Sequence, residues 1–224
     1  MPDSRFSQYS RSARKKASVV SEPLAVCPDQ PVIRPGDPEL PNFRRSFKAG
    51  SDIFSIPTGE SGVNDSKKLT KKRMEKLYPL ITGGATAFGT GWVFQKEIDE
   101  INILQATKKA FAEAYRNALA HCPGDYVCSD VFVDAVKELD IPAVQHSLIH
   151  GDALCYSIAA ASIVAKVERD RYMIAAAEKF PQYGFEKNVG YGTKQHMDAL
   201  REFGPCELHR RSFIKKILAE RGEC

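Results

Sequence analysis

The chain has 224 residues, a net charge of +4, 43% hydrophobic residues and 27% charged residues. This length fits one domain with an appendage, and the hydrophobic content is enough for a packed core, which excludes a wholly disordered chain. No apolar run reaches the roughly 18 residues of a membrane-spanning helix, and the N-terminus lacks the apolar core of a secretory signal. We therefore expect a cytoplasmic protein with no membrane partner. The six scattered cysteines lack CxxC pairs, which favours free thiols over a disulfide framework or a zinc site.

Residues 1–60 differ from the rest of the chain. Eight of the 13 prolines lie there, and no helical or strand period is sustained. The composition predicts an irregular or disordered segment, followed by a folded domain over 61–224. The first 20 residues are rich in Arg and Lys, which is typical of a solvated basic tail and also of an organellar transit peptide.

The first regular stretch is a basic helix that should begin after Thr70. Lysines cluster around its start, and a lysine-rich helix N-terminus is a natural phosphate site, although many basic helices are only solvated. A strand is expected over 85–94 and a long amphipathic helix over 97–119. The expected buried positions are Met74, Leu77 and Ile81 in the first helix and Ile98, Ile101, Leu104, Phe111, Tyr115 and Leu119 in the second.

Two carboxylates are each expected at the end of a strand. The apolar run 126–130 ends in Asp130, and the alternating run 143–149 is followed by Asp152 at the start of a helix of small residues over 157–180. Carboxyl ends of strands meet at one sheet edge, where open α/β sheets build their sites. The alternative for Asp152 is a structural acid that the helix dipole favours.

The C-terminal third is expected to be helical. Tyr191 stands between two glycines in the loop 181–193, where it is either a core-facing aromatic or a stacking platform for a nucleotide. A helix over 194–203 should stop at Gly204. The final helix should bury Phe213, Ile217 and Leu218.

Two strand-end acids beside basic helix starts suggest divalent metal chemistry on a phosphodiester. Hard oxygen ligands favour Mg²⁺ or Mn²⁺. Two acids are too few for a complete two-metal site, so further ligands would have to come from elsewhere in the chain.

Five segments, in the same order as in the family, resemble ribonuclease HII, and the resemblance covers about residues 60 to 216. It implies the α/β ribonuclease H fold, with a mixed sheet flanked by helices and a C-terminal helical part. It also implies a monomeric endonuclease that uses Mg²⁺ or Mn²⁺ to cut the RNA strand of RNA–DNA hybrids, or DNA at single ribonucleotides. The segments are 62–69, 97–107, 151–166, 184–193 and 209–213.

The resemblance also assigns roles to individual residues. Asp130 and Asp152 correspond to the third and fourth metal-binding acids of the family, and are therefore the expected catalytic residues. Tyr191 corresponds to the tyrosine that packs on the deoxyribose next to the ribonucleotide. The residues expected to hold DNA phosphates are Asn64, Ser66, Lys67 and Lys68.

The chain departs from the family pattern in two places. The family's Asp-Glu-Ala-Gly-Arg-Gly strand, which supplies the first two metal ligands, is absent, and the proline-rich segment 27–39 stands in its place. Prolines at this density forbid a central strand. Val131 follows Asp130, where the family has glycine. The acids available as substitutes are Asp29, Asp37 and Glu39.

Three interpretations follow from these departures. The chain is a working nuclease with ligands from elsewhere, an inactive or truncated relative that only binds hybrid or junction nucleic acid, or the product of a frameshift or misjudged gene boundary. A fourth interpretation is an interaction domain that binds no nucleic acid.

Overall fold

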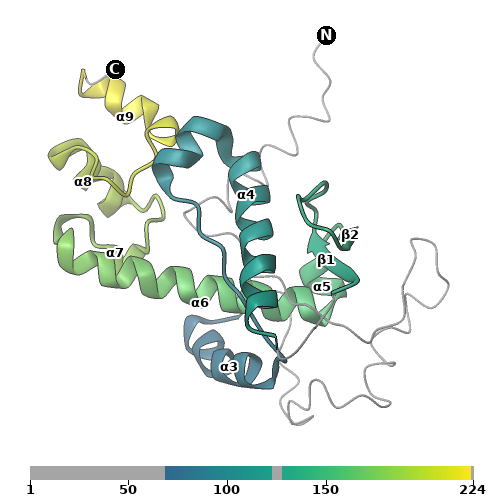
Figure 1. Ribbon diagram of the computed structural model, residues 1–224. Helices are drawn as coiled ribbons and strands as arrows, with labels where there is room; N and C mark the ends of the chain where they lie inside the picture. Colours follow the sequence, from purple (N-terminus) through teal and green to yellow (C-terminus); the bar gives the residue numbers. More distant parts are fainter. Residues whose placement is uncertain (1–68, 123–127, 223–224) are drawn as a thin grey trace.

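The protein is described by a computed structural model over residues 69–122 and 128–222, in which a small sheet lies at one side of a group of helices (Figure 1). The expected irregular segment 1–60, and with it the domain boundary, lies outside these ranges. None of the helices in these ranges is long and apolar enough to cross a membrane. The elements are α3 (Lys71–Gly84), α4 (Gln95–Ala120), β1 (Asp130–Asp134), β2 (Val144–Leu148), α5 (Gly151–Leu154), α6 (Tyr156–Lys179), η3 (Pro181–Tyr183), α7 (Phe185–Asn188), α8 (Lys194–Phe203), η4 (Arg211–Phe213) and α9 (Lys215–Glu220).

Helix α3 begins as the sequence predicts. The hydroxyl of Thr70 accepts a hydrogen bond from the backbone N–H of Arg73 at 3.3 Å, which satisfies one of the unpaired donors of the first turn. The predicted stripe of Met74, Leu77 and Ile81 is buried against α6, in a cluster with Ile163, Val164 and Val167. This stripe fixes α3 to the outer side of α6.

The segment 85–94 is extended but is not the strand that the sequence predicts, since only Trp92 is a bridge residue. It lies instead along α4 at very short range. A Cβ on Gly89 would come within 2.3 Å of the Ala118 nitrogen, and one on Gly91 within 1.9 Å of the Ala110 oxygen. Glycine is therefore required where this segment crosses the alanine face of α4.

Helix α4 is divided by a kink that the sequence analysis did not predict. Asn102 has φ 67° and ψ 165°, and its Oδ1 accepts hydrogen bonds from the N–H groups of Leu104 and Gln105 at 3.0 and 3.2 Å. It thus caps the second part of the helix. The break shifts the phase of the apolar stripe, so Leu104, predicted to be buried, is 54% exposed.

The sheet in the described ranges consists of two parallel strands, β1 and β2, with Asp130 opposite Val144 and Asp134 opposite Leu148. The strand predicted over 143–149 is confirmed as β2. Val131 and Val133 of β1 are buried against Phe111 and Tyr115 of α4. This packing joins the sheet to the second part of α4.

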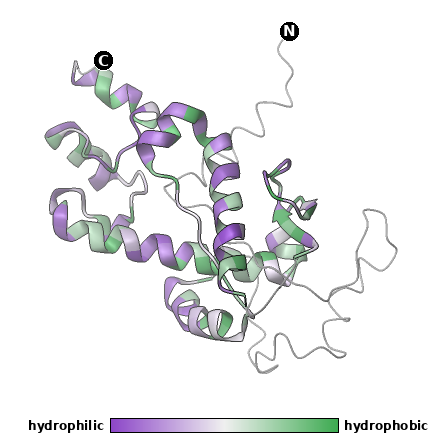
Figure 2. Ribbon diagram, in the orientation of Figure 1, coloured by the Kyte–Doolittle hydropathy of each residue, from purple (hydrophilic) through white to green (hydrophobic). Residues whose placement is uncertain are grey.

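Helix α6 is the element around which the others pack, and it contacts α3, α5, α7 and β1 (Figure 1). The predicted run of small residues is buried throughout its first part, from Ser157 to Ala165. Figure 2 shows α6 changing from largely hydrophobic near α5 to more hydrophilic farther along. The buried part supports the sheet end, and the polar part leads to the C-terminal helices.

The C-terminal helices form their own apolar cluster on the far part of α6. Helix α8 has the predicted bounds, the Thr193 hydroxyl caps it, and it stops at Gly204. Ile217 and Leu218 of α9 are buried as predicted. Phe213 is 41% exposed, contrary to prediction, because it lies in η4 before α9 and stacks with the Arg210 guanidinium at 3.7 Å.

Candidate active site

Two acidic residues, Asp134 and Asp152, lie near each other where β1 ends and α5 begins. Asp134 is the last residue of β1, and its Oδ1 accepts a hydrogen bond from the Gly151 N–H at 3.0 Å. Asp152 is the next residue along, in the first turn of α5, and is 6% exposed. The two acids therefore occupy the edge that the sequence predicted for Asp130 and Asp152.

Gly151 packs against Ile158 of α6 and lies in ordinary contact distance of β1. A Cβ at this position would lie 2.6 Å from Cδ1 of Ile158 and 3.5 Å from the Cα of Asp134. His150 before it has φ 58°, a left-handed conformation that turns the chain sharply after β2. The turn and the hydrogen bond from the Gly151 N–H to Asp134 place Asp152 near the end of β1.

The prediction that Asp130 shares this edge is wrong. Asp130 opens β1 rather than closing the preceding apolar run, so it lies four residues, or about 13 Å of strand, from Asp134. Its carboxylate accepts hydrogen bonds from His146 Nε2 and from the Ser129 hydroxyl, both at 2.7 Å. The bond from His146, followed by that from Ser129, lowers the pKa of Asp130. Asp130 therefore stabilises the opposite end of the sheet.

The misplacement arose because the strand lies four residues later than the apolar run suggested. A usable signal was present in the family pattern, which has glycine after the third acid. Ala135, which follows Asp134, has φ 59°, in the left-handed region that favours glycine, whereas Val131 lies inside β1. The family's Asp-Gly pair can therefore be aligned with Asp134 and Ala135 once the bounds of β1 are known.

Tyr191 lies beside the middle of α6, and its side chain is 45% exposed. Its ring is 5.3 Å from the ammonium of Lys166 and 5.2 Å from the guanidinium carbon of Arg169. Arg169 also donates to the Val189 carbonyl at 2.7 Å, which holds the loop on the helix. Of the two predicted roles, the displayed aromatic agrees with this geometry, and the core-facing one does not.

Positive charge gathers near this loop. Arg210 is partly buried, and burial, followed by the nearby charge of Arg169, lowers its pKa to about 10. Asp99 holds the segment after Arg210, since its carboxylate accepts from the N–H groups of Arg211 and Ser212 at 2.7 and 3.2 Å. Two of the segments that resemble the family, 97–107 and 209–213, thus meet in space.

The start of α3 is a second basic surface. Lys71, Lys72 and Arg73 are exposed in its first turn, which contains no acidic residue. Exposed cations and free N–H groups at a helix N-terminus suit phosphate. The four residues predicted to hold DNA phosphates, Asn64, Ser66, Lys67 and Lys68, precede this helix and lie outside the described residues.

Asp134 and Asp152 fit Mg²⁺ or Mn²⁺ in kind, because carboxylate oxygens are the donors that these ions prefer. They do not complete a site. Within residues 69–122 and 128–222, no group of three or more His, Cys, Asp or Glu side chains could hold a metal ion. The candidate substitutes Asp29, Asp37 and Glu39 lie outside these ranges.

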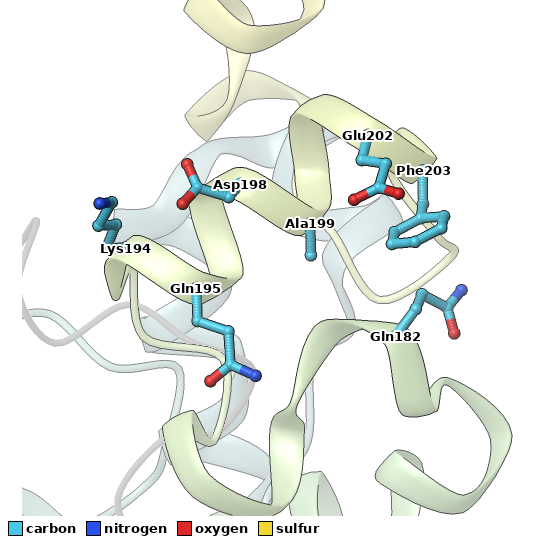
Figure 3. Close-up of a pocket in the computed structure, with 7 residues that line it drawn as sticks. All are labelled: Gln182, Lys194, Gln195, Asp198, Ala199, Glu202 and Phe203. Carbon is cyan, nitrogen blue, oxygen red and sulfur yellow. The ribbon is translucent and has the colours of Figure 1, made fainter.

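A shallow hollow between η3 and α8 is lined by both charged and apolar side chains (Figure 3). Gln182 faces it from η3, and Gln195, Glu202 and Phe203 face it from α8. It lies at the C-terminal helices, away from the sheet edge that carries the two acids (Figure 1). Its lining contains more acids than bases, so it does not resemble a phosphate site.

Comparison with known proteins identifies the family. The sequence matches the family model of ribonuclease HII over residues 58–216. It is 47% identical over 156 residues to ribonuclease HII of Caldanaerobacter subterraneus subsp. tengcongensis, covering 70% of this chain and 62% of that protein. It is 49% identical over 160 residues to ribonuclease HII of Bacillus thuringiensis, covering 71% of this chain and 58% of that protein. The chain thus spans about three fifths of the length of these relatives.

A solved structure is similar as well. The crystal structure of ribonuclease H2 from Pyrococcus horikoshii OT3 matches with a TM-score of 0.56 and 24% sequence identity, covering 73% of this chain and 83% of that one. This match confirms the fold class that the resemblance implied. The family match over most of the chain leads to one conclusion: the chain belongs to the ribonuclease HII family.

Proposed function

We propose that the protein is an endonuclease that cuts the RNA strand of RNA–DNA hybrids and DNA strands at single ribonucleotides. The observation that carries the proposal is that Asp134 and Asp152 lie at one sheet edge, where α5 begins. Helix α6 follows α5 and runs from this edge to Tyr191. Relatives that share nearly half of the aligned residues bear the name ribonuclease HII. Monomeric state and a cytoplasmic location remain predictions.

We assign the third metal-binding acid to Asp134 in place of Asp130. The assignment is supported by the position of Asp134 beside Gly151 and Asp152, and by the left-handed residue that follows it. The carboxylate of Asp130 is engaged by His146 and Ser129 at the other end of the strand. Two acids that bind the same ion have to lie close together. Of Asp130 and Asp134, only Asp134 lies close to Asp152.

Asp134 and Asp152 would hold Mg²⁺ or Mn²⁺ together with ligands from outside the described residues. When bound, such ions supply the positive charge that activates a water molecule and stabilises the leaving oxygen. The protein's own contribution is position. The register of β1 with β2 and the hydrogen bond from the Gly151 N–H to Asp134 hold both residues at one edge.

Substrate binding is assigned to two basic surfaces and one aromatic ring. Lys166 stands ten residues into α6, about 15 Å along the helix from its first residue. The ring of Tyr191 lies against it. A sugar ring can pack on an exposed tyrosine while neighbouring cations neutralise the backbone phosphates. The start of α3, with Asn64, Ser66, Lys67 and Lys68 before it, would hold phosphates of the DNA strand.

The alternative function is binding without cleavage. It is favoured by one observation, that the described residues provide only two acids at the site. The Tyr191 loop and the exposed cations of α3 would still bind a hybrid or a junction.

One experiment separates these functions and also tests the new assignment. A duplex with a single ribonucleotide is incubated with Mg²⁺ or Mn²⁺ and the full chain, Asp134→Asn, Asp152→Asn or Asp130→Asn. We expect cleavage by the full chain and by Asp130→Asn, and none by the other two variants. Salt-sensitive binding without cleavage by any protein would support the binding function. Loss of cleavage in Asp130→Asn alone would return the role to Asp130.

A further inference from the structure

Two histidines, the buried His196 and the partly buried His209, connect the loop after α8 to the backbone of Tyr191. The Cys206 N–H lies 2.9 Å from His209 Nδ1, and His209 Nε2 lies 2.9 Å from His196 Nε2. His196 Nδ1 in turn lies 2.9 Å from the carbonyl oxygen of Tyr191. The result is an unbroken line of hydrogen bonds across the C-terminal helices.

The direction of this line is fixed by its first member. A backbone N–H can only donate, so His209 Nδ1 accepts from Cys206 and the proton of this ring is on Nε2. His209 Nε2–H then donates to His196 Nε2, which leaves the proton of His196 on Nδ1. That N–H donates to the Tyr191 carbonyl. Each histidine is neutral and has one defined tautomer.

The surroundings keep the pair neutral and rigid. His196 is 4% exposed, the ring of Tyr183 meets that of His209 edge-on at 4.8 Å, and the ring of Phe185 meets that of His196 edge-on at 5.5 Å. Burial lowers the pKa of both imidazoles, and with the neighbouring His196 it lowers the pKa of His209 to about 4. The thiol of Cys206 is 3.2 Å from His209 Nδ1, which is again the accepting atom.

The line of hydrogen bonds ends at the carbonyl of Tyr191, which also forms the hydrogen bond of a turn. The oxygen of Tyr191 also accepts the Thr193 N–H at 2.8 Å, and the hydroxyl of Thr193 caps α8 by accepting the His196 N–H at 3.3 Å. The backbone of Tyr191 is therefore tied to α8 through both a turn and an imidazole. Its exposed ring is displayed from a fixed base.

We propose that His196 and His209 are positioning residues that orient Tyr191 for the sugar next to a ribonucleotide. The inference rests on the proposed function of Tyr191. Neither imidazole needs to touch the nucleic acid. His196 acts through the Tyr191 carbonyl, and His209 acts by holding His196 in the tautomer that donates to it.

The test compares His196→Asn with His196→Leu. An Asn Nδ2 takes nearly the place of His Nδ1, so it retains the donor to the Tyr191 carbonyl, whereas Leu removes it. Both variants lose the bond to His209 and the ring packing, so a purely structural role would affect them equally. Circular dichroism and melting temperature establish that each variant is folded.

Two readouts are measured on the full chain. Hydrogen exchange of the Thr193 amide reports the turn at Tyr191 without any nucleic acid. Binding to a DNA duplex with one ribonucleotide, relative to the all-DNA duplex of the same sequence, reports recognition. In His196→Leu we expect exchange at Thr193 to be faster and the binding preference to be lower, each by about tenfold, as for the loss of one hydrogen bond. His196→Asn should retain most of both.

Each outcome decides the proposal. Unchanged exchange and preference in His196→Leu, or equal losses in the Leu and Asn variants, would overturn it. Nitrogen NMR that found the proton of His196 on Nε2 would also overturn it. If exchange behaves as expected but the wild type and Tyr191→Ala bind both duplexes equally, the proposed role of Tyr191 fails while the positioning of its backbone stands.

Discussion

The two ends of the candidate site are built in different ways. At the acid end, Asp134 and Asp152 are placed by the backbone, through a strand register, a left-handed turn and the Gly151 N–H. At the other end, Tyr191 is placed by side chains, with Arg169 and His196 each holding a carbonyl of its loop. Because β1 ends four residues later than the predicted strand, Asp134 rather than Asp130 lies at the acid end. The position of Tyr191 depends instead on several contacts to its loop.

The largest effect should come from the acid end. Asp134→Asn should reduce cleavage by more than about 100-fold, since losses of 10- to 100-fold already follow removal of groups that only support metal ligands. Asp130→Asn is the matched control, because it removes an acid from the same strand. Its cleavage rate should stay near that of the wild type, measured below its melting temperature. Equal rates for the two variants would mean that the sheet edge is not the metal site.

The side-chain end should be sensitive to acid. Because the folded protein lowers the pKa of His196 and His209, it binds fewer protons than the unfolded chain between about pH 4 and 6.5. The stabilisation is complete above pH 6.5 and is lost as the pH falls, by roughly 1 to 3 kcal/mol at about 1.4 kcal/mol per pKa unit. Urea unfolding across this range measures it.

His209→Leu is the control for this pH effect, and it should flatten the dependence of unfolding free energy on pH. An equally steep dependence in the variant would assign the effect to other groups. Asp130 does not interfere with this measurement. Because its pKa is lowered from the ordinary value of about 3.8, the stabilisation that it contributes is lost only below about pH 3.8.

A smaller effect is expected from the ring itself. Tyr191→Ala should lower the preference for the ribonucleotide duplex over all-DNA duplex by roughly tenfold, in the range of 1 to 3 kcal/mol for one stacked group. Total affinity should change less, because the phosphate contacts remain. Competition binding with both duplexes measures the ratio. A proportional loss for both duplexes would make Tyr191 a general contact.

The smallest effect should come from the start of α3. Lys72→Ala should make the slope of log affinity against log salt shallower by about 0.9, the value for one lost phosphate contact. Lys179→Ala is the control, because its ammonium is paired with Glu207 at 2.5 Å. Identical slopes for wild type and Lys72→Ala would remove this residue from the phosphate contacts.

Local patterns predicted the helices well where capping and periodicity agreed. Thr70 and Gly204 mark helix ends in the structure as they do in the sequence, and the stripe of α3 is buried as predicted. The pattern failed at Asn102 and over 85–94. At Asn102 the side chain accepts hydrogen bonds from backbone N–H groups and the regular helix is interrupted. Over 85–94 the chain follows the alanine face of α4 without forming a strand.

By itself the sequence determined the family, the buried helix of small residues, and the positions of Asp152 and Tyr191 after a strand and in a glycine-bounded loop. Only the tertiary structure decided which acid stands beside Asp152. The physical reason is that an apolar run specifies the faces of a strand but not the residue at which it begins and ends, which depends on pairing with β2. The histidine line to Tyr191 likewise exists only in space, since it joins residues from separate segments through ring nitrogens whose tautomers are set by their neighbours.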